Sequence, residues 1–447
     1  MEIVSEHCEG NRTGHGHRAG KDQKCAGVKY SEMDAAELSA EYGIVKEKYD
    51  RLKAGGMKLN ITRGKPGKEQ LDMVSDILAL PVDYVSDGTD VRNYGEVTGL
   101  PAAKRLFADI LGCRSEECII GGSSSLNLMY DVISRGFCFG LLRSEKPWSK
   151  LERVKWLCPA PGYDRHFKVT QAFGFELIAV PMTENGPDMD RVEELIRDDA
   201  VKGMWCVPKY SNPDGIIYSS ETVHRIAAMK PAAADFALMW DNAYCVHEFE
   251  GAFVPFEDIL TLCREAGNPY MVYEFASTSK ITFPGAGLSV LAASVDNVKY
   301  MEKLLSVQTI CYDKVNQLRH VEYLRDKAHT LELMKKHAEI LRPKFGCVLR
   351  RLDSDIAPLG IAQWQRPRGG YFVSVNTAPG LAKRTLELCR DAGVTMTGAG
   401  AAFPYGVDPQ DSNIRIAPTL PPVEELEAAM EIFCFSLRLA ALEKTMG

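Results

Sequence analysis

Short apolar runs alternate with amphipathic stretches along most of the chain. The apolar runs end at polar loops and predict strands at residues 154–158, 203–207, 237–240, 271–275 and 288–293. The stretches between them, such as 126–133 and 189–196, have helical spacing of apolar residues, and Asp188 stands at the expected N-cap of the second. This alternation predicts an α/β protein, whose parallel sheet would bind a ligand at the carboxyl ends of its strands.

The pattern changes after about residue 325, where a charged helical stretch at 323–341 leads to the segment RPRGGYFVSV. Near the end of the chain, residues 424–444 place apolar side chains on one helical face, directly after two prolines. We therefore expect a second, smaller α+β domain. The predicted division is a mobile polar head at 1–28, the first part of the small domain at 29–85, a large domain at 86–325 and the rest of the small domain at 326–447.

Composition narrows the functional classes. The net charge of −7 argues against a general nucleic-acid binder. No apolar run approaches the roughly 18–20 residues that cross a membrane, and the polar head, with His7, His15 and His17, lacks the apolar region of a secretory signal. The 13 cysteines include no C-x-x-C spacing, so we expect reduced thiols in a cytoplasmic protein and no structural metal.

Two polar motifs follow predicted strands directly. The motif STSK ends at Lys280, and the motif DNAY runs from Asp241 to Tyr244. A lysine in a desolvated cleft has a lowered pKa and can act as a nucleophile, although most lysines are surface charges. An aspartate at a strand end can keep a pyridine nitrogen protonated, or it can simply cap the next helix.

Two further motifs are weaker when each is taken alone. The segment KYSNPDG contains Asn212, and its N-P-D-G core is by itself a turn signal. The segment GGSSS places Ser123, Ser124 and Ser125 before a helical pattern. Small residues at a helix start expose backbone N–H groups and suit a phosphate, but they also fit a plain N-cap.

In this order, and followed by a late arginine, the four motifs resemble those of the fold type I pyridoxal-phosphate-dependent aminotransferases. The spacings 241 − 212 = 29 and 280 − 241 = 39 are of the size found in that family. The stretches LNITRGKPGKEQLD, DGTDVRNYGEVTGL, VKWLCPAPGYDRHF and VPMTENGPDMD are similar to a bacterial subgroup of aspartate aminotransferases. The resemblance covers about residues 30–440.

The resemblance implies a large domain with a mainly parallel, seven-stranded-type sheet flanked by helices, and a smaller α+β domain. Pyridoxal 5'-phosphate would be bound to Lys280, and the chain would form a homodimer with shared active sites. Tyr163 would stack on the cofactor ring, and His166 would bond the aspartate that holds the ring nitrogen. Tyr244 and Asn212 would bond the phenolic oxygen of the ring.

The phosphate and the substrate carboxylate would be bound by other residues. Tyr94 would reach the phosphate of the neighbouring subunit. Arg415 would bind the substrate α-carboxylate, because its planar fork pairs with a carboxylate through two parallel bonds. Many relatives also have an arginine seven or eight residues after the lysine, and this chain has none there. Ser277 and Ser279, with the serine loop, would then carry more of the phosphate contacts.

A dicarboxylic substrate needs a second cation, because an unpaired buried carboxylate is costly. The candidates are Arg63, Lys65 and Arg368. We favour Arg63, because the segment around Gly64 matches the part that closes over the substrate in relatives. For each candidate alone, a solvated surface charge is the simpler interpretation.

The expected reaction is a ping-pong transamination from L-aspartate or L-glutamate to a 2-oxo acid such as 2-oxoglutarate. Two alternatives stay open from the sequence. A decarboxylase or lyase would use the same cofactor on an amino acid. A sensor with an aminotransferase-like domain would need a DNA-binding module, and only about thirty polar residues precede the first matching motif.

Overall fold

The computed structural model describes residues 29–447, so the polar head and its three histidines lie outside the described residues. Its largest sheet has eight strands, in the order β4 (Cys118–Gly121), β11 (Ser289–Ala293), β10 (Val272–Ser277), β9 (Ala237–Asp241), β8 (Val201–Cys206), β5 (Lys155–Ala160), β6 (Glu176–Thr183) and β7 (Gly186–Pro187). The five strands from β10 to β6 are parallel, and β11 is antiparallel to both of its neighbours. The carboxyl ends of the parallel strands therefore share one edge of the sheet.

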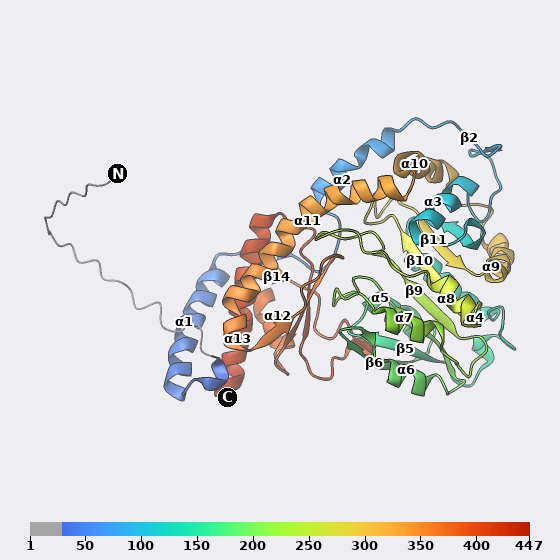
Figure 1. Cartoon of the computed structure of the whole chain (residues 1–447). Coiled ribbons are helices and arrows are strands. Elements are labelled where there is room, and N and C mark those ends of the chain that lie inside the picture. Colours follow the sequence, from blue (N-terminus) through green and yellow to red (C-terminus); the bar gives the residue numbers. More distant parts are fainter. Residues whose placement is uncertain (1–28) are drawn as a thin grey trace, which may run out of the picture.

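Helices cover both faces of this sheet (Figure 1). On one face lie α3 (Pro101–Leu111), α6 (Met189–Leu195), α7 (Ser220–Ala227), α8 (Ile259–Glu265) and α10 (Lys314–Leu324); on the other lie α4 (Ser125–Cys138), α5 (Asp164–Ala172) and α9 (Val295–Gln308). Strand β9 shows why both faces are covered: Leu238 and Trp240 pack into one hydrophobic cluster, and Ala237 and Met239 into the other. Fully apolar strands of this kind are typical of parallel sheets.

A third hydrophobic cluster holds the small domain together. Its helices are α1 (Ala35–Ala54), the C-terminal half of α11 (Lys327–Asp355), α12 (Ala382–Asp391) and α13 (Val423–Met446). They pack with a three-stranded antiparallel sheet of β12 (Ala362–Trp364), β13 (Val373–Thr377) and β15 (Asn413–Ile416), and with the parallel pair β1 (Leu59–Asn60) and β14 (Val394–Thr395). Figure 1 shows α11 running from the large domain into the small one.

Short elements connect these parts. Between β1 and α3 lie α2 (Lys68–Met73) and the hairpin of β2 (Val85–Ser86) and β3 (Thr89–Asp90). Single turns of 3-10 helix occur at Tyr30–Glu32, Ser75–Ala79, Ser115–Glu117, Trp148–Lys150, Ala357–Leu359 and Pro404–Gly406. Within residues 29–447, no helix has both the length and the apolar character needed to cross a membrane.

The fold confirms the predicted α/β architecture, and all five predicted strands lie within one or two residues of observed ones. Asp188 caps α6 as expected, by accepting from the backbone N–H of Arg191. The helical stretch predicted at about 323–341 is helical, but a break divides it, because α10 ends at Leu324 and α11 begins at Lys327. Between them Arg325 has a φ of 60°, and Asp326 caps the second helix. The exact domain boundaries stay a prediction.

Candidate active site

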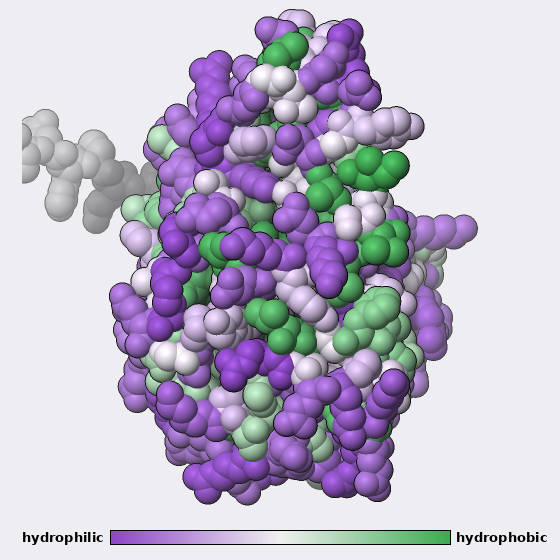
Figure 2. Space-filling view, turned by 90° about the vertical axis from the view of Figure 1, so that its right-hand side faces the viewer, coloured by the Kyte–Doolittle hydropathy of each residue, from purple (hydrophilic) through white to green (hydrophobic). Residues whose placement is uncertain are grey.

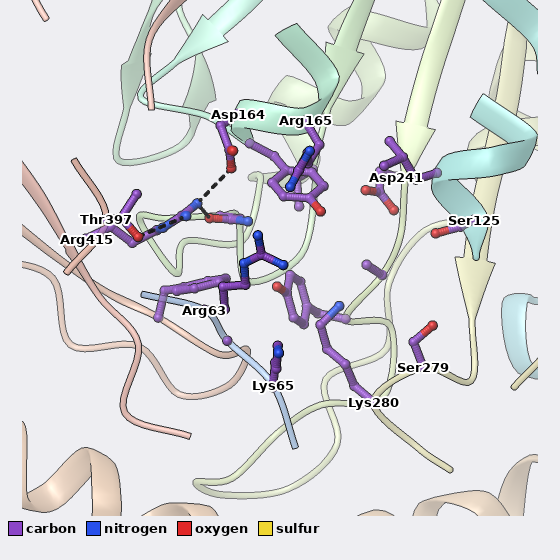
Figure 3. Close-up of a pocket in the computed structure, with 18 of the residues that line it drawn as sticks. Arg63, Lys65, Ser125, Asp164, Arg165, Asp241, Ser279, Lys280, Thr397 and Arg415 are labelled. Atoms are coloured by element: carbon purple, nitrogen blue, oxygen red, sulfur yellow. Dashed lines mark hydrogen bonds and ion pairs between the residues drawn. The ribbon is translucent and has the colours of Figure 1, made fainter. Parts of the chain in front are cut away.

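A cavity of about 540 Å³ lies at the carboxyl ends of β5, β8, β9 and β10, facing the small domain (Figure 3). The large domain contributes residues that follow these strands and the first turn of α4. The small domain contributes residues 62–65, Phe372, residues 396–398 and Arg415. The site therefore combines groups from both domains at the edge where open α/β sheets place their ligands.

Lys280 lines this cavity, three residues beyond the end of β10. Its Nζ is 4.6 Å from the ring centroid of Tyr244 and 5.8 Å from that of Tyr371. Burial lowers the pKa of the Lys280 amine, while the carboxylate of Asp241 acts in the opposite direction. An amine that loses its proton more easily is a better nucleophile and base.

Asp241 ends β9 and is buried, with 4% of its surface exposed. Its Oδ2 lies 3.0 Å from Nε2 of His166, which is itself buried and stacks on Trp205 with 4.4 Å between ring centroids. The other oxygen, Oδ1, is buried and has no hydrogen-bond partner among the described residues. A buried carboxylate oxygen without a partner fits a ligand that brings its own N–H donor.

Three predicted ring contacts surround the same space. Tyr163, which directly precedes α5, and the buried Tyr244 and Asn212 all line the cavity. Burial raises the pKa of Tyr163 to about 12 and also raises the pKa of Tyr244 well above its usual value. Both phenols therefore keep their protons near neutral pH and can donate hydrogen bonds.

The serines gather at one end of the cavity, around the N-terminus of α4. Ser124, Ser125, Ser277 and Ser279 line the cavity, whereas Ser123 does not. The Ser279 hydroxyl donates to the backbone carbonyl of Ser123 at 3.1 Å and accepts from Ser277 at 3.0 Å. Hydroxyls and the positive end of a 14-residue helix make this end of the cavity suitable for an anion.

Arg415 lies on β15 at the opposite side of the cavity, as Figure 3 shows. Its Nη1 donates to Asn212 at 3.1 Å and to Asp164 at 3.3 Å, and its Nη2 donates to Thr397 at 3.3 Å. Its guanidinium carbon lies 4.8 Å from the ring centroid of Phe372. These contacts fix the plane of the guanidinium, which is the geometry that carboxylate recognition needs.

Two of the three candidate cations for a second carboxylate line the cavity. Arg63 and Lys65 are exposed within it on either side of Gly64, and Arg368 is not among the lining residues. A Cβ atom on Gly64 would lie 2.7 Å from Cζ of Phe372. The residue without a side chain thus lets this segment approach the Phe372 ring closely.

Tyr94 lies outside the cavity of its own chain. Its side chain is 75% exposed. Figure 2 shows several hydrophobic groups on the face that is on the right in Figure 1, where β2, α4 and α9 are labelled. Other exposed apolar side chains include Tyr130 on α4, Val307 on α9 and Ile310 just after α9, and Val307 is 88% exposed. Clustered exposed apolar residues are typical of protein–protein contact surfaces.

The sequence reasoning gave no role to several lining residues, including Asp164, Arg165, Lys168, Phe372 and Thr397. Asp164 and Arg165 directly follow Tyr163, and Lys168 lies one helical turn after Asp164 on α5, so their closeness in sequence to a site residue was the available signal. Phe372 and Thr397 come from the small domain and had no such signal. Their roles depend on contacts with Arg415 that only the folded chain creates.

Comparison with known proteins identifies the family of the chain. The family model described as aspartate amino-transferase matches residues 32–447. A curated aspartate aminotransferase from Corynebacterium glutamicum is 48% identical over 419 residues, which are 93% of this chain and 97% of that protein. The crystal structure of an aspartate transaminase from the same organism covers 94% of this chain and 99% of its own, at a TM-score of 0.91.

A more distant structure shows the same fold. It is an α-aminoadipate aminotransferase from Thermus thermophilus, complexed with N-(5'-phosphopyridoxyl)-L-leucine. Its identity is 21%, its TM-score is 0.69, and it covers 91% of this chain and 98% of that one. The close matches extend over nearly the full length of both proteins. The chain therefore belongs to the aspartate aminotransferase family of fold type I, and it is a transaminase.

Proposed function

We propose that this transaminase binds pyridoxal 5'-phosphate on Lys280 and transfers the amino group of L-aspartate or L-glutamate to a 2-oxo acid such as 2-oxoglutarate. One observation carries the proposal: the Lys280 amine, the unpartnered Oδ1 of Asp241 and the Arg415 guanidinium all face one cavity. The printed name of the relative that is 48% identical, aspartate aminotransferase, supports the choice of substrate.

The residues present fit the cofactor. Asp241 would accept a hydrogen bond from the pyridinium nitrogen through its free Oδ1, while His166 holds Oδ2. Tyr163 would stack on the ring, and Asn212 and Tyr244 would bond its phenolic oxygen. The serines at the start of α4, with Ser277 and Ser279, would bind the phosphate. When bound, the cofactor supplies an electron sink for the charge that develops at the substrate Cα.

The protein's own groups then move the proton. The Lys280 amine lines the cavity and, as a free base, would take the proton from the substrate Cα. The lowered pKa of its amine favours the free base that this step requires. Arg415 would hold the α-carboxylate so that the Cα–H bond faces Lys280.

The second carboxylate of the substrate would bind near Arg63. This residue lines the cavity between Arg415 and Lys280 in Figure 3. A cation at this place would favour dicarboxylic substrates over monocarboxylic ones, because an unpaired charge in the cavity is costly. Lys65 lies on the same segment and is the alternative cation.

The active form would be a homodimer with shared sites. The 75% exposed Tyr94 and the exposed apolar residues Tyr130 and Val307 support this proposal. Tyr94 would then reach the phosphate end of the neighbouring subunit's cavity, where this chain lacks the expected arginine. The cytoplasmic location stays a prediction from the sequence.

An absorbance titration tests the function. The purified protein, supplied with pyridoxal phosphate, should show a visible band that L-aspartate bleaches and 2-oxoglutarate restores. The Lys280→Ala variant should lose the band and should lose at least about 10⁴-fold in turnover. A band that aspartate leaves unchanged would overturn the substrate, and release of CO₂ from aspartate would indicate a decarboxylase instead.

A further inference from the structure

The cavity segment from Thr62 to Gly67 has no regular secondary structure. It carries Arg63 and Lys65, yet its backbone is tied mainly by side chains from elsewhere. Thr397 donates to the carbonyl of Thr62 at 2.6 Å, and Thr419 donates to the carbonyl of Lys65 at 2.8 Å. The position of this segment therefore depends on buried side-chain anchors rather than on a strand or a helix.

Gln70, in the first turn of α2, is the most completely bonded of these anchors. Its side chain is fully buried. Its Oε1 accepts from the backbone N–H of Gly67 at 3.1 Å, and its Nε2 lies 3.1 Å from the Tyr371 hydroxyl and 2.9 Å from Nδ1 of His337. Both amide hydrogens and the carbonyl oxygen of Gln70 thus have partners. One of these partners, His337, lies 267 residues away in the sequence.

His337, on α11, continues this connection to the loop that carries Lys280. Its Nε2 lies 3.0 Å from the backbone carbonyl of Ile281, the residue that follows Lys280. A carbonyl only accepts and the Gln70 amide nitrogen only donates. The hydrogen is therefore on Nε2, and Nδ1 accepts from Gln70. Burial lowers the pKa of His337 to about 4, so this neutral form holds near pH 7.

The hydrogen bonds form one buried path, from the Gly67 N–H through Gln70 and His337 to the Ile281 carbonyl. One end of the path fixes the segment of Arg63 and Lys65, and the other end fixes the backbone beside Lys280. Neither Gln70 nor His337 lines the cavity. We propose that Gln70 and His337 are positioning residues that hold the substrate-binding segment and the Lys280 loop in one fixed relation.

The physical reason lies in the geometry that proton transfer requires. A displacement of about 1 Å between substrate and catalytic base can cost about a hundredfold in rate. The two segments belong to distant parts of the chain, so the short path through Gln70 and His337 restricts their relative movement. The proposal rests on the proposed function only where it places the substrate at residues 62–65.

Hydrogen exchange tests the connection without any substrate. In Gln70→Met, the amides of Ile281 and Thr282, which Gln70 does not contact, should exchange at least about tenfold faster than in the wild type. In His337→Leu, the amides of residues 67–71 should likewise exchange at least about tenfold faster than in the wild type. The double variant should resemble each single variant, because both changes break one path. The control Glu69→Gln, at an exposed neighbouring position, should leave both regions unchanged.

The variant His337→Asn separates the two ends and guards against simple misfolding. Asparagine can still accept from Gln70 but is too short to reach Ile281, so only residues 281–282 should lose protection. Faster exchange confined to residues 67–73 in Gln70→Met would overturn the proposal and leave a local packing role.

Activity adds a second readout. With L-aspartate and 2-oxoglutarate, Gln70→Met and His337→Leu should lower kcat/KM about tenfold or more while the cofactor absorbance band is kept. Unchanged kcat/KM would contradict a positioning role. A wild-type protein that ignores aspartate would overturn the proposed substrate, and the exchange experiment would still decide the role of Gln70 and His337.

Discussion

His166 Nε2 lies 3.0 Å from Oδ2 of Asp241, and the imidazole is stacked on the Trp205 ring at 4.4 Å. Because the carboxylate only accepts, Nε2 carries the hydrogen and donates it. The histidine thereby fixes one oxygen of Asp241 and leaves the other directed at the ligand space. This arrangement explains why a buried carboxylate can stay in place before any ligand binds.

Replacing Asp241 with asparagine should therefore lower kcat by about 10²–10³-fold, the usual effect of removing one preorganised electrostatic partner. The fold should survive, because the amide oxygen of asparagine can still accept from His166. Steady-state kinetics with L-aspartate measure the effect. The control Asp190→Asn changes an 89% exposed carboxylate that pairs with Arg225, and it should leave kcat unchanged. Equal activity of Asp241→Asn and the wild type would remove Asp241 from the mechanism.

Arg415→Lys should raise KM for L-aspartate by about 10- to 100-fold. Lysine keeps the charge but loses the planar fork, and a hydrogen bond to a charged group contributes about 1.5–3 kcal/mol. The contacts with Asn212, Thr397 and Phe372 that orient the guanidinium would be lost as well. Arg384→Lys, at an exposed ion pair with Glu443, is the matched control and should change KM little. An unchanged KM in Arg415→Lys would place the α-carboxylate elsewhere.

Much of the fold and of the site could be predicted because the signals are local. Lys280, Asp241 and Asn212 each follow an apolar strand within a few residues, so one rule about strand ends placed all three in one cavity. The break at Arg325 could not be predicted from apolar spacing, since the helical pattern continues across it. A positive φ of 60° at an arginine is a backbone conformation that sequence composition does not predict.

The site residues that were not predicted act through contacts with residues far away in the sequence. Thr397 and Phe372 contribute by their contacts with Arg415, and Gln70 contributes by its bond to His337. A buried glutamine or histidine in a helical pattern looks the same as a solvated one until its partners are known. Such roles emerge only once tertiary structure brings the partners together.

Gly64→Ala should raise KM for L-aspartate at least about tenfold. The new Cβ would lie 2.7 Å from Cζ and 2.9 Å from Cε1 of Phe372, and 3.2 Å from Cβ of Tyr371, so the segment or the Phe372 ring that packs on Arg415 must move. Displacements of this size at a substrate-binding segment weaken catalysis strongly. The matched control is Gly43→Ala on α1, where no atom lies within 4 Å of the new Cβ.

In Gly43→Ala the kinetics should not change, and the protein should gain up to about 1 kcal/mol of stability from the better helix former. If Gly64→Ala also left KM unchanged, residues 62–65 would not contact the substrate in the way proposed. Comparing both variants at equal folded fraction, measured by circular dichroism, separates a kinetic effect from a loss of stability.

Glu274→Gln should change how stability depends on pH. Glu274 lies on β10, is buried, and accepts a hydrogen bond from Nδ2 of Asn242 at 2.9 Å. Burial raises its pKa from 4.5 to about 8, the Asn242 hydrogen bond opposes this, and the carboxylates of Asp258 and Glu117 add to it. The folded protein therefore holds a proton on Glu274 that the unfolded chain releases between these two pH values.

The sign of the effect follows from this proton. The stability that protonated Glu274 contributes is fully present below about pH 4.5 and is lost as the pH rises to about 8. Glutamine at position 274 carries no such proton and keeps the acceptor for Asn242. The free energy of unfolding of the variant, relative to that of the wild type, should therefore rise as the pH rises, by on the order of 4 kcal/mol at most.

Urea unfolding of both proteins at several pH values from 5 to 8.5 gives the difference in their free energies of unfolding. Taking the difference removes the pH dependence of all groups that the two proteins share. Glu265→Gln, an exposed glutamate on α8, should give a difference that does not vary with pH. If the difference in free energy of unfolding between Glu274→Gln and the wild type did not vary with pH either, Glu274 would already be ionised in the folded protein at neutral pH. A buried ionised carboxylate beside the turn that carries Asn242 and Tyr244 would then need a cationic partner, contrary to the contacts described for it.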